Sequence, residues 1–194
     1  YIARGEGCRV WDADGNEFIE WGMGLRAVGL GHAYPSVVEA ARKAMLGGTN
    51  FTRPTLIELE AAEAFLDLVP GADMVKFSKD GSDATSGAVR VSRAYTGRDM
   101  VARCVNHPFF AVDDWFIGTT PMSAGIPEAV RELTATFRYN DIESVEQLFE
   151  QYPDRLACLI LEPEKYDPPA DGFLQKLRDL CDRNGTVLIF DEMI

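Results

Sequence analysis

Two runs of apolar residues in the C-terminal third of the chain constrain its fold more than any other feature. Leu156 to Leu161 and Thr186 to Phe190 are each of strand length, and neither alternates with charged residues. Strands of this kind are covered on both faces, as in parallel sheets flanked by helices. A segment with Leu174, Leu177 and Cys181 at helical spacing separates them. We therefore predict an α/β fold with a mainly parallel sheet and helices on both faces.

The remaining elements follow from local signals. The Asp-Gly pair between Cys8–Trp11 and Glu17–Trp21 predicts a hairpin. Met100 to Val105 is a further strand-length apolar run, whereas Asn106 to Thr136 shows no clear period and predicts a long functional loop. Helix start signals stand at four places: Pro35, the Thr55–Glu58 capping box, Asp141 and Asp171.

A strand, a glycine turn and a helix are predicted in the middle of the chain. Ala72 to Phe77 has the composition of a short buried strand, and Gly81 allows a tight turn. The helix follows from Ser82, with an apolar face of Ala84, Ala88, Val91 and Tyr95. The turn could hold a phosphate on unpaired backbone N–H groups, or it could be an ordinary helix start capped by Asp80 or Ser82.

Composition excludes several classes of function. The 194 residues carry a formal net charge of −12 without a Lys/Arg cluster, which argues against nucleic-acid partners and an anionic membrane surface. No signal-like segment or apolar run of membrane length is present, so we expect a cytoplasmic protein. The four dispersed cysteines predict free, mostly buried thiols, and two histidines make a histidine-based metal centre improbable.

Three polar features are predicted at the carboxyl edge of the sheet, where ligands bind in such folds. They are the Gly81-Ser82 turn, Glu162 and Asp191. A carboxylate at the end of a buried strand is costly to desolvate unless a cation meets it. A helix start for a phosphate and a carboxylate for a cationic ring nitrogen suit pyridoxal 5'-phosphate (PLP).

Several motifs occur in the order and at the spacings of one known family: Trp11-Asp12-x-x-Gly15, Leu30-Gly31-His32-x-x-Pro35, Gly81-Ser82-Asp83-Ala84, Val91-x-Arg93-Ala94-Tyr95-Thr96-Gly97, Leu161-Glu162-Pro163 and Phe190-Asp191-Glu192. With them the chain resembles class III PLP-dependent aminotransferases over essentially its whole length, and most closely the glutamate-1-semialdehyde aminomutase-like branch. The resemblance implies a fold type I architecture and a homodimer with its active sites at the subunit interface.

The resemblance also implies roles for individual residues. Gly81 and Ser82 would hold the cofactor phosphate, and Asp191 would be the catalytic carboxylate that pairs with the pyridinium nitrogen. Glu162 would help to orient the site, or would only close a turn before Pro163. The Schiff-base lysine would lie beyond Ile194, so residues 1–194 alone are predicted to be inactive.

The sequence departs from the family pattern at two positions. Asn106 stands where the family places an aromatic residue that stacks on the cofactor ring. Stacking would then fall to Phe109, His107 or another residue, or be absent, and Phe109 could instead pack in the core. Asp80 replaces a neutral residue beside the phosphate turn and weakens that site slightly. In the glycine-rich loop, Arg26 is either a solvated side chain or a ligand for a substrate carboxylate.

The resulting hypothesis is a PLP-dependent aminotransferase or aminomutase that acts on a small-molecule amino donor and a carbonyl acceptor. Residues 1–50 would form an N-terminal segment, and residues 51–194 the first part of a large PLP-binding domain that continues in a longer protein. The alternative is a non-catalytic relative that binds cofactor or a partner. A dinucleotide-binding dehydrogenase is disfavoured because the glycine fingerprint is missing.

Overall fold

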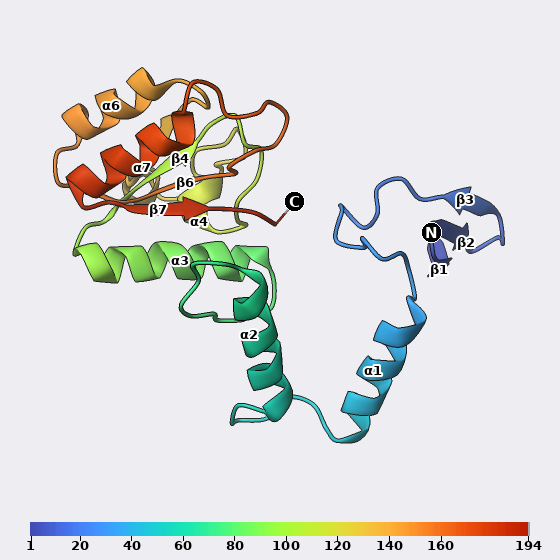
Figure 1. Ribbon diagram of the computed structural model, residues 1–194. Coiled ribbons are helices and arrows are strands. Elements are labelled where there is room, and N and C mark those ends of the chain that lie inside the picture. Colours follow the sequence, from blue (N-terminus) through green and yellow to red (C-terminus); the bar gives the residue numbers. More distant parts are fainter. Residues whose placement is uncertain (194) are drawn as a thin grey trace. The chain divides into compact units, whose positions relative to one another are not determined.

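A computed structural model describes residues 1–193 and divides into two compact units, Tyr1–Lys76 and the chain from Phe77 onward (Figure 1). The first unit contains β1 Ile2–Glu6, β2 Arg9–Asp12, β3 Glu17–Ile19, α1 Pro35–Leu46 and α2 Leu56–Leu68. The second contains α3 Gly81–Thr96, β4 Met100–Cys104, α4 Asp114–Ile117, α5 Glu128–Arg131, β5 Thr134–Phe137, α6 Ile142–Gln151, β6 Leu156–Leu161, α7 Phe173–Asn184 and β7 Val187–Phe190. The domain boundary after residue 50 stays a prediction.

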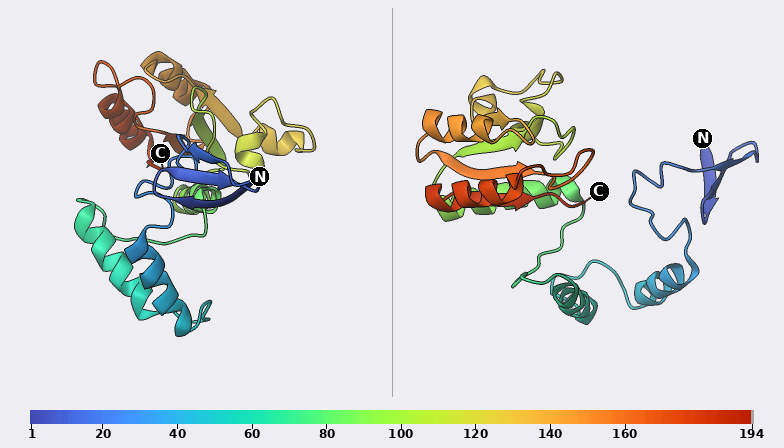
Figure 2. Two further views of the ribbon diagram at one scale, coloured as in Figure 1. Left: turned by 90° about the vertical axis from the view of Figure 1, so that its right-hand side faces the viewer. Right: turned by 45° about the horizontal axis from the view of Figure 1, so that its top comes forward.

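The first unit begins with three antiparallel strands in the order β1-β2-β3, which lie side by side in Figure 2. The predicted hairpin is its second half, whereas β1 was not predicted. Asp12 closes the turn, because its carboxylate accepts hydrogen bonds from the N–H groups of Asp14 and Asn16 and from the Asn16 amide. The Asn16 side chain, followed by these N–H groups, lowers the pKa of Asp12.

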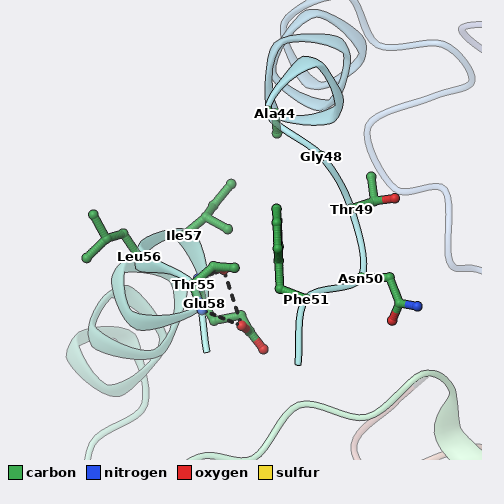
Figure 3. Close-up of a pocket in the computed structure, with 10 residues that line it drawn as sticks. Ala44, Gly48, Thr49, Asn50, Phe51, Thr55, Leu56, Ile57 and Glu58 are labelled. Carbon is green, nitrogen blue, oxygen red and sulfur yellow. Dashed lines mark hydrogen bonds between the residues drawn. The ribbon is translucent and has the colours of Figure 1, made fainter. Parts of the chain in front are cut away.

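Both predicted helices of the first unit are confirmed. Helix α1 begins at Pro35, and α2 has the complete capping box, with Thr55 N–H donating to Glu58 Oε2 at 2.8 Å and Glu58 N–H to Thr55 Oγ1 at 3.4 Å (Figure 3). Neither helix contains a buried residue. No helix within residues 1–193 is both long and apolar enough to cross a membrane.

The second unit is a parallel four-stranded sheet in the order β5-β4-β6-β7. Helices α6 and α7 cover one face and α3 covers the other, as Figure 1 shows. Strand β6 is buried throughout: Leu159 and Leu161 point into the core under α6 and α7, and Cys158 and Ile160 into the core under α3. The predicted α/β fold is thereby confirmed.

Three of the four cysteines are buried, and all four thiols are free. Burial raises the pKa of Cys158 and of Cys181 to about 12, so both are neutral packing residues at physiological pH. This agrees with the prediction of free thiols among apolar neighbours, while Cys8 is exposed.

Two predicted segments are wrong. Ala72 to Phe77 forms no strand, its residues are exposed or half-buried, and it has no partner strand among residues 1–193. A strand without neighbours is not stable. The segment from Asn106 to Thr136 is not one loop, since it contains α4, α5 and most of β5. Each of these elements has only four residues, too few to show a period in the sequence.

Two details of the helices also differ from the prediction. Helix α3 buries Thr85, Val89 and Ser92 rather than the predicted apolar face, because the two hydroxyls donate to carbonyl oxygens and can be buried at little cost. Ala84, Val91 and Tyr95 on the predicted face are exposed. Helix α7 is preceded by Gly172 in the left-handed region, with no side-chain cap, so Asp171 does not cap it.

Arg98 forms hydrogen bonds to backbone carbonyls at the start of β6 and at the end of α7, and the Arg98→Ala variant tests how much they stabilise the fold. Its Nη1 atom donates to the carbonyl oxygens of Asn184 at 2.7 Å and of Leu156 and Gly185 at 3.2 Å. The substitution leaves the part-buried Asn184 carbonyl without this donor, while the Leu156 carbonyl keeps its bond from Thr186 Oγ1. We therefore expect a loss of about 2 kcal/mol in the free energy of unfolding. Denaturant titration of the full-length protein measures it. The exposed Arg90→Ala serves as the control, and equal stability of the two variants would contradict this role.

Candidate active site

A cavity of about 320 Å³ opens at the carboxyl edge of the parallel sheet, within the second unit. It is lined by the first residues of α3, the segment after β4, and the residues that follow β6 and β7. These are Asp80, Gly81, Ser82, Pro108, Phe109, Phe110, Glu162, Lys165, Asp191 and Met193. Five of the residues singled out in the sequence, Gly81, Ser82, Phe109, Glu162 and Asp191, therefore lie around one cavity.

The start of α3 presents two unused hydrogen-bond donors. Asp80 is the N-cap: its carboxylate accepts from Asp83 N–H at 2.9 Å, and its carbonyl oxygen from Ala84 N–H at 3.1 Å. Among the described residues no acceptor faces the N–H groups of Gly81 and Ser82. The capping interpretation is confirmed, with Asp80 as the cap. The cap satisfies deeper N–H groups and leaves the first two available to an anion, so the phosphate site stays a prediction.

Hydrogen bonds attach the first turn of α3 to the segment after β4. The Ser82 hydroxyl accepts from Val112 N–H at 3.1 Å, and Thr85 Oγ1 donates to the Phe110 carbonyl at 2.8 Å. A Cβ on Gly81 would lie 2.7 Å from the Met193 sulfur, so the absence of a side chain at Gly81 makes room for the Met193 side chain. The contact of Thr85 with the segment after β4 was not predicted from the sequence, where its only signal was a hydroxyl residue one turn into the helix.

Asp191 and Glu162 end neighbouring parallel strands. Leu161 pairs with Phe190 in the ladder, and Asp191 N–H donates to the Leu161 carbonyl at 2.9 Å, so the two carboxylates leave the sheet side by side. Burial raises the pKa of Asp191, and the charge of Glu162 raises it further. Met193 N–H, at 3.2 Å from Asp191 Oδ1, acts in the opposite direction.

Lys165 was not predicted to belong to this site. Its Nζ lies 2.6 Å from Glu162 Oε1, and the two side chains are 7% and 8% exposed. Glu162 Oε2 is buried and has no hydrogen-bond partner among the described residues. The signal in the sequence was a lysine three residues after a glutamate, across Pro163, at the end of a buried strand.

His107 does not line the cavity, contrary to its prediction as a possible stacking residue. It is 3% exposed and lies behind Glu162, whose N–H donates to His107 Nδ1 at 3.0 Å. Its ring packs against Tyr139, with 5.1 Å between ring centroids, and edge-on against Phe110. Burial lowers the pKa of His107, which is held as a neutral acceptor.

His107 should make the protein less stable in acid. Its ordinary pKa is 6.5, and the folded value is lower, so as the pH falls below 6.5 the unfolded chain takes up a proton that the folded chain does not. Stability from this residue is complete above pH 6.5 and is lost toward the folded pKa. His107→Asn keeps an acceptor that cannot titrate, so we expect a shallower loss of unfolding free energy on acidification. An unchanged slope in denaturation of the full-length protein at a series of pH values would contradict this.

Phe109 and Arg26 occupy different units. Phe109 lines the cavity, is 51% exposed and meets Phe116 edge-on at 5.6 Å between centroids, which leaves a ring face for stacking on a ligand. Arg26 belongs to the first unit, is exposed and has a φ of 72°. Its contact with a substrate carboxylate stays a prediction.

A larger cavity of about 780 Å³ lies wholly in the first unit, between the end of α1 and the start of α2 (Figure 3). Phe51, Leu56 and Ile57 line it, and its one carboxylate, Glu58, is occupied in the capping box. It has no convergent polar groups comparable to those at the sheet edge. We therefore assign the chemistry to the smaller cavity.

The two ends of the sheet-edge cavity have different chemistry. Free N–H groups at a helix start suit a phosphate, and a buried, partly compensated carboxylate pair suits a cationic nitrogen. Around a parallel α/β sheet this donor set fits PLP, which carries both groups. The residues around this cavity therefore fit the cofactor of the class of PLP-dependent transferases.

Comparison with known proteins places the chain within that class. The family model for class-III aminotransferases matches residues 1–194, and the chain belongs to this family. PLP is the cofactor of the family, and solved relatives include a transaminase with PLP bound. The fold is accordingly that of fold type I.

Similar proteins include both transaminases and aminomutases. A glutamate-1-semialdehyde 2,1-aminomutase of Bacillus mycoides is 37% identical over 100% of this chain and 48% of its own length. An omega-transaminase from Sphaerobacter thermophilus superposes with a TM-score of 0.93 at 33% identity over 99% of this chain and 48% of its own. The FumI protein of Sphingopyxis sp. MTA144, in its PLP internal aldimine form, gives 0.90 at 31% identity, with 99% and 47% covered. The chain spans about half the length of these relatives.

Proposed function

We propose that the full-length protein is a PLP-dependent enzyme that transfers or shifts an amino group on a small amino acid or amine. One observation carries the proposal: two unpartnered backbone donors, at Gly81 and Ser82, and a pair of carboxylates far along the sequence, at Glu162 and Asp191, line one cavity. The substrates of the enzyme would be a small-molecule amino donor and a carbonyl acceptor. Membership of the family supports amino-group chemistry in general, and the particular substrate belongs to the proposal.

Each residue would have a separate task. The N–H groups of Gly81 and Ser82 would bind the phosphate, and Asp191 would hold a proton on the ring nitrogen. When bound, the protonated ring supplies an electron sink for the pair of electrons left after proton removal from the substrate. Glu162 would hold the end of β6 in place beside Asp191, and His107 would accept the hydrogen bond from the Glu162 N–H. Phe109 would stack on the ring.

Aminotransferase and aminomutase activities both remain within the proposal. Relatives of both kinds are similar over the whole chain, and the residues described here are compatible with either reaction. A homodimer with sites at the subunit interface and a cytoplasmic location are parts of the same proposal. The alternative of a non-catalytic relative receives no support from the comparisons.

The proposal is tested by absorption spectroscopy of the purified full-length protein. We expect a cofactor band in the near ultraviolet or violet region after incubation with PLP, and a change in that band on addition of amino donors. A chain that gives no band at saturating PLP would refute the proposal. Residues 1–194 expressed alone are expected to give no borohydride-reducible adduct on a specific lysine, because the Schiff-base lysine is predicted to lie further along.

Asp80→Asn should strengthen cofactor binding. The carboxylate of Asp80 lies at the N-cap beside the two free donors and repels a phosphate there. Asparagine keeps the oxygen that accepts from Asp83 N–H and removes the charge. We expect about threefold tighter binding of PLP, the size of a typical charge effect at a helix start. Equilibrium titration at low ionic strength measures it, and weaker binding in this variant would contradict the placement of the phosphate.

A further inference from the structure

The buried ion pair between Lys165 and Glu162 is not explained by packing alone. Both side chains are more than nine-tenths buried, their charged atoms are 2.6 Å apart, and both residues line the candidate cofactor cavity. Taking two charges out of water is costly, and hydrophobic residues of similar volume would often be as stable. The cost is increased by Glu162 Oε2, which has no partner among the described residues.

The ion pair lies next to a third charge. Asp191 follows the strand adjacent to that of Glu162, and the charge of Lys165 opposes the effect of Glu162 on the pKa of Asp191. The negative charge of Glu162 beside it raises the pKa of Asp191 and so disfavours its charged form. Of the other groups that face them, Asp80 adds negative charge and His107, behind Glu162, is neutral. Lys165 is therefore the one cationic side chain among the described residues that line the cavity.

We propose that Lys165 is a positioning residue whose ammonium group offsets the charge of Glu162 beside Asp191, and so keeps Asp191 ionised and available to the ring nitrogen of the cofactor. The part that concerns the cofactor rests on the proposed function, whereas the coupling of the three side chains does not. Without Lys165, the charge of Glu162 acts on Asp191 unopposed. Asp191 then spends part of its time neutral and no longer pairs with a cationic ring.

The coupling is tested without cofactor, by carboxyl ¹³C NMR of the full-length protein over a pH series, with the Asp191 signal assigned through Asp191→Asn. In Lys165→Met we expect the Asp191 titration midpoint to move to higher pH. Lys165→Arg should restore it toward the wild-type value, and the exposed Lys176→Met should leave it in place. A midpoint in Lys165→Met equal to that of the wild type would overturn the proposal.

Lys165→Met leaves Glu162 buried without its partner and could misfold. The same substitution is therefore also made in a protein that carries Glu162→Gln. Glu162→Gln and the double variant Glu162→Gln/Lys165→Met carry no orphaned carboxylate. Between these two, loss of Lys165 should again move the Asp191 midpoint upward. An unchanged midpoint would show that the ammonium group acts only on Glu162 and would refute the coupling.

Titration with PLP separates failure of this inference from failure of the proposed function. If the wild-type protein does not bind PLP, the proposed function fails, while the NMR result still decides the coupling. If it binds, we expect about tenfold weaker affinity in Lys165→Met, with a ¹⁵N shift of the pyridine nitrogen toward its unprotonated value. Unchanged affinity together with an unchanged ¹⁵N shift would overturn the role of Lys165 toward the cofactor.

Discussion

Replacement of Asp191 by Asn in the PLP-loaded full-length protein is expected to slow the first half of amino transfer by about 10²–10³-fold. Asparagine has nearly the same shape and can still accept the hydrogen bond from Met193 N–H. It carries no charge, so the ring nitrogen loses the partner that favours its protonated form. The rate is measured in single turnovers with an excess of an amino donor, from the change in cofactor absorbance.

Asp179→Asn is the matched control for this substitution. Asp179 lies on the exposed side of α7, where its carboxylate accepts from the Gln175 amide, and its neutralisation should leave the rate within about twofold of the wild type. A rate for Asp191→Asn close to that of the control would show that Asp191 does not face the ring nitrogen. The pair thus separates a local role from a general effect of charge on this acidic protein.

Replacement of Ser82 by Asp is expected to weaken PLP binding by about 100-fold, because it places a carboxylate against a phosphate at a half-buried helix start. The new side chain can still accept from Val112 N–H, as the serine hydroxyl does at 3.1 Å. Binding of pyridoxal, which lacks the phosphate, should change much less. The measurement is a pair of equilibrium titrations, one with each compound.

Ser36→Asp provides the control for this prediction. Ser36 is an exposed residue in the first turn of α1, so the same substitution is made at a second helix start that lies in the other unit. It should leave the affinity for PLP unchanged. If Ser82→Asp weakened the binding of pyridoxal as much as that of PLP, the phosphate would not lie at the start of α3.

The sequence predicted the frame of the site because that frame depends on a few strong rules. Uninterrupted apolar runs identified β6 and β7 as parallel strands, and parallel strands bring their carboxyl ends to one edge. Glu162 and Asp191 could therefore be placed together without coordinates. Only β6 is buried throughout, whereas β7 at the end of the strand order is half-buried and its Phe190 is exposed, so the prediction that both runs are covered on both faces is wrong for β7. The Gly81-Ser82 turn was expected beside these carboxylates by the same rule. It does line the cavity, but the strand predicted before it does not form, so the rule does not explain its position.

The sequence did not predict the contacts of Lys165, His107 and Thr85. Which neighbour a side chain contacts depends on its conformation in the folded chain, and this leaves no periodic pattern in the sequence. Lys165 lies in an irregular turn, and nothing in the sequence shows that its side chain bends back to Glu162. His107 was considered for the cofactor because of its place near a family motif, but it supports the backbone of Glu162 from inside the core. Thr85 was predicted on neither face of α3, since a buried hydroxyl needs an acceptor that only the folded chain provides.

The most direct test of these assignments is a crystal structure of the full-length protein grown with PLP. Phosphate oxygens are expected within hydrogen-bond distance, about 3 Å, of the N–H groups of Gly81 and Ser82, and the pyridine nitrogen at a similar distance from an Asp191 oxygen. A structure in which the same PLP molecule reached only one of these two ends, or lay in another cavity, would contradict the account.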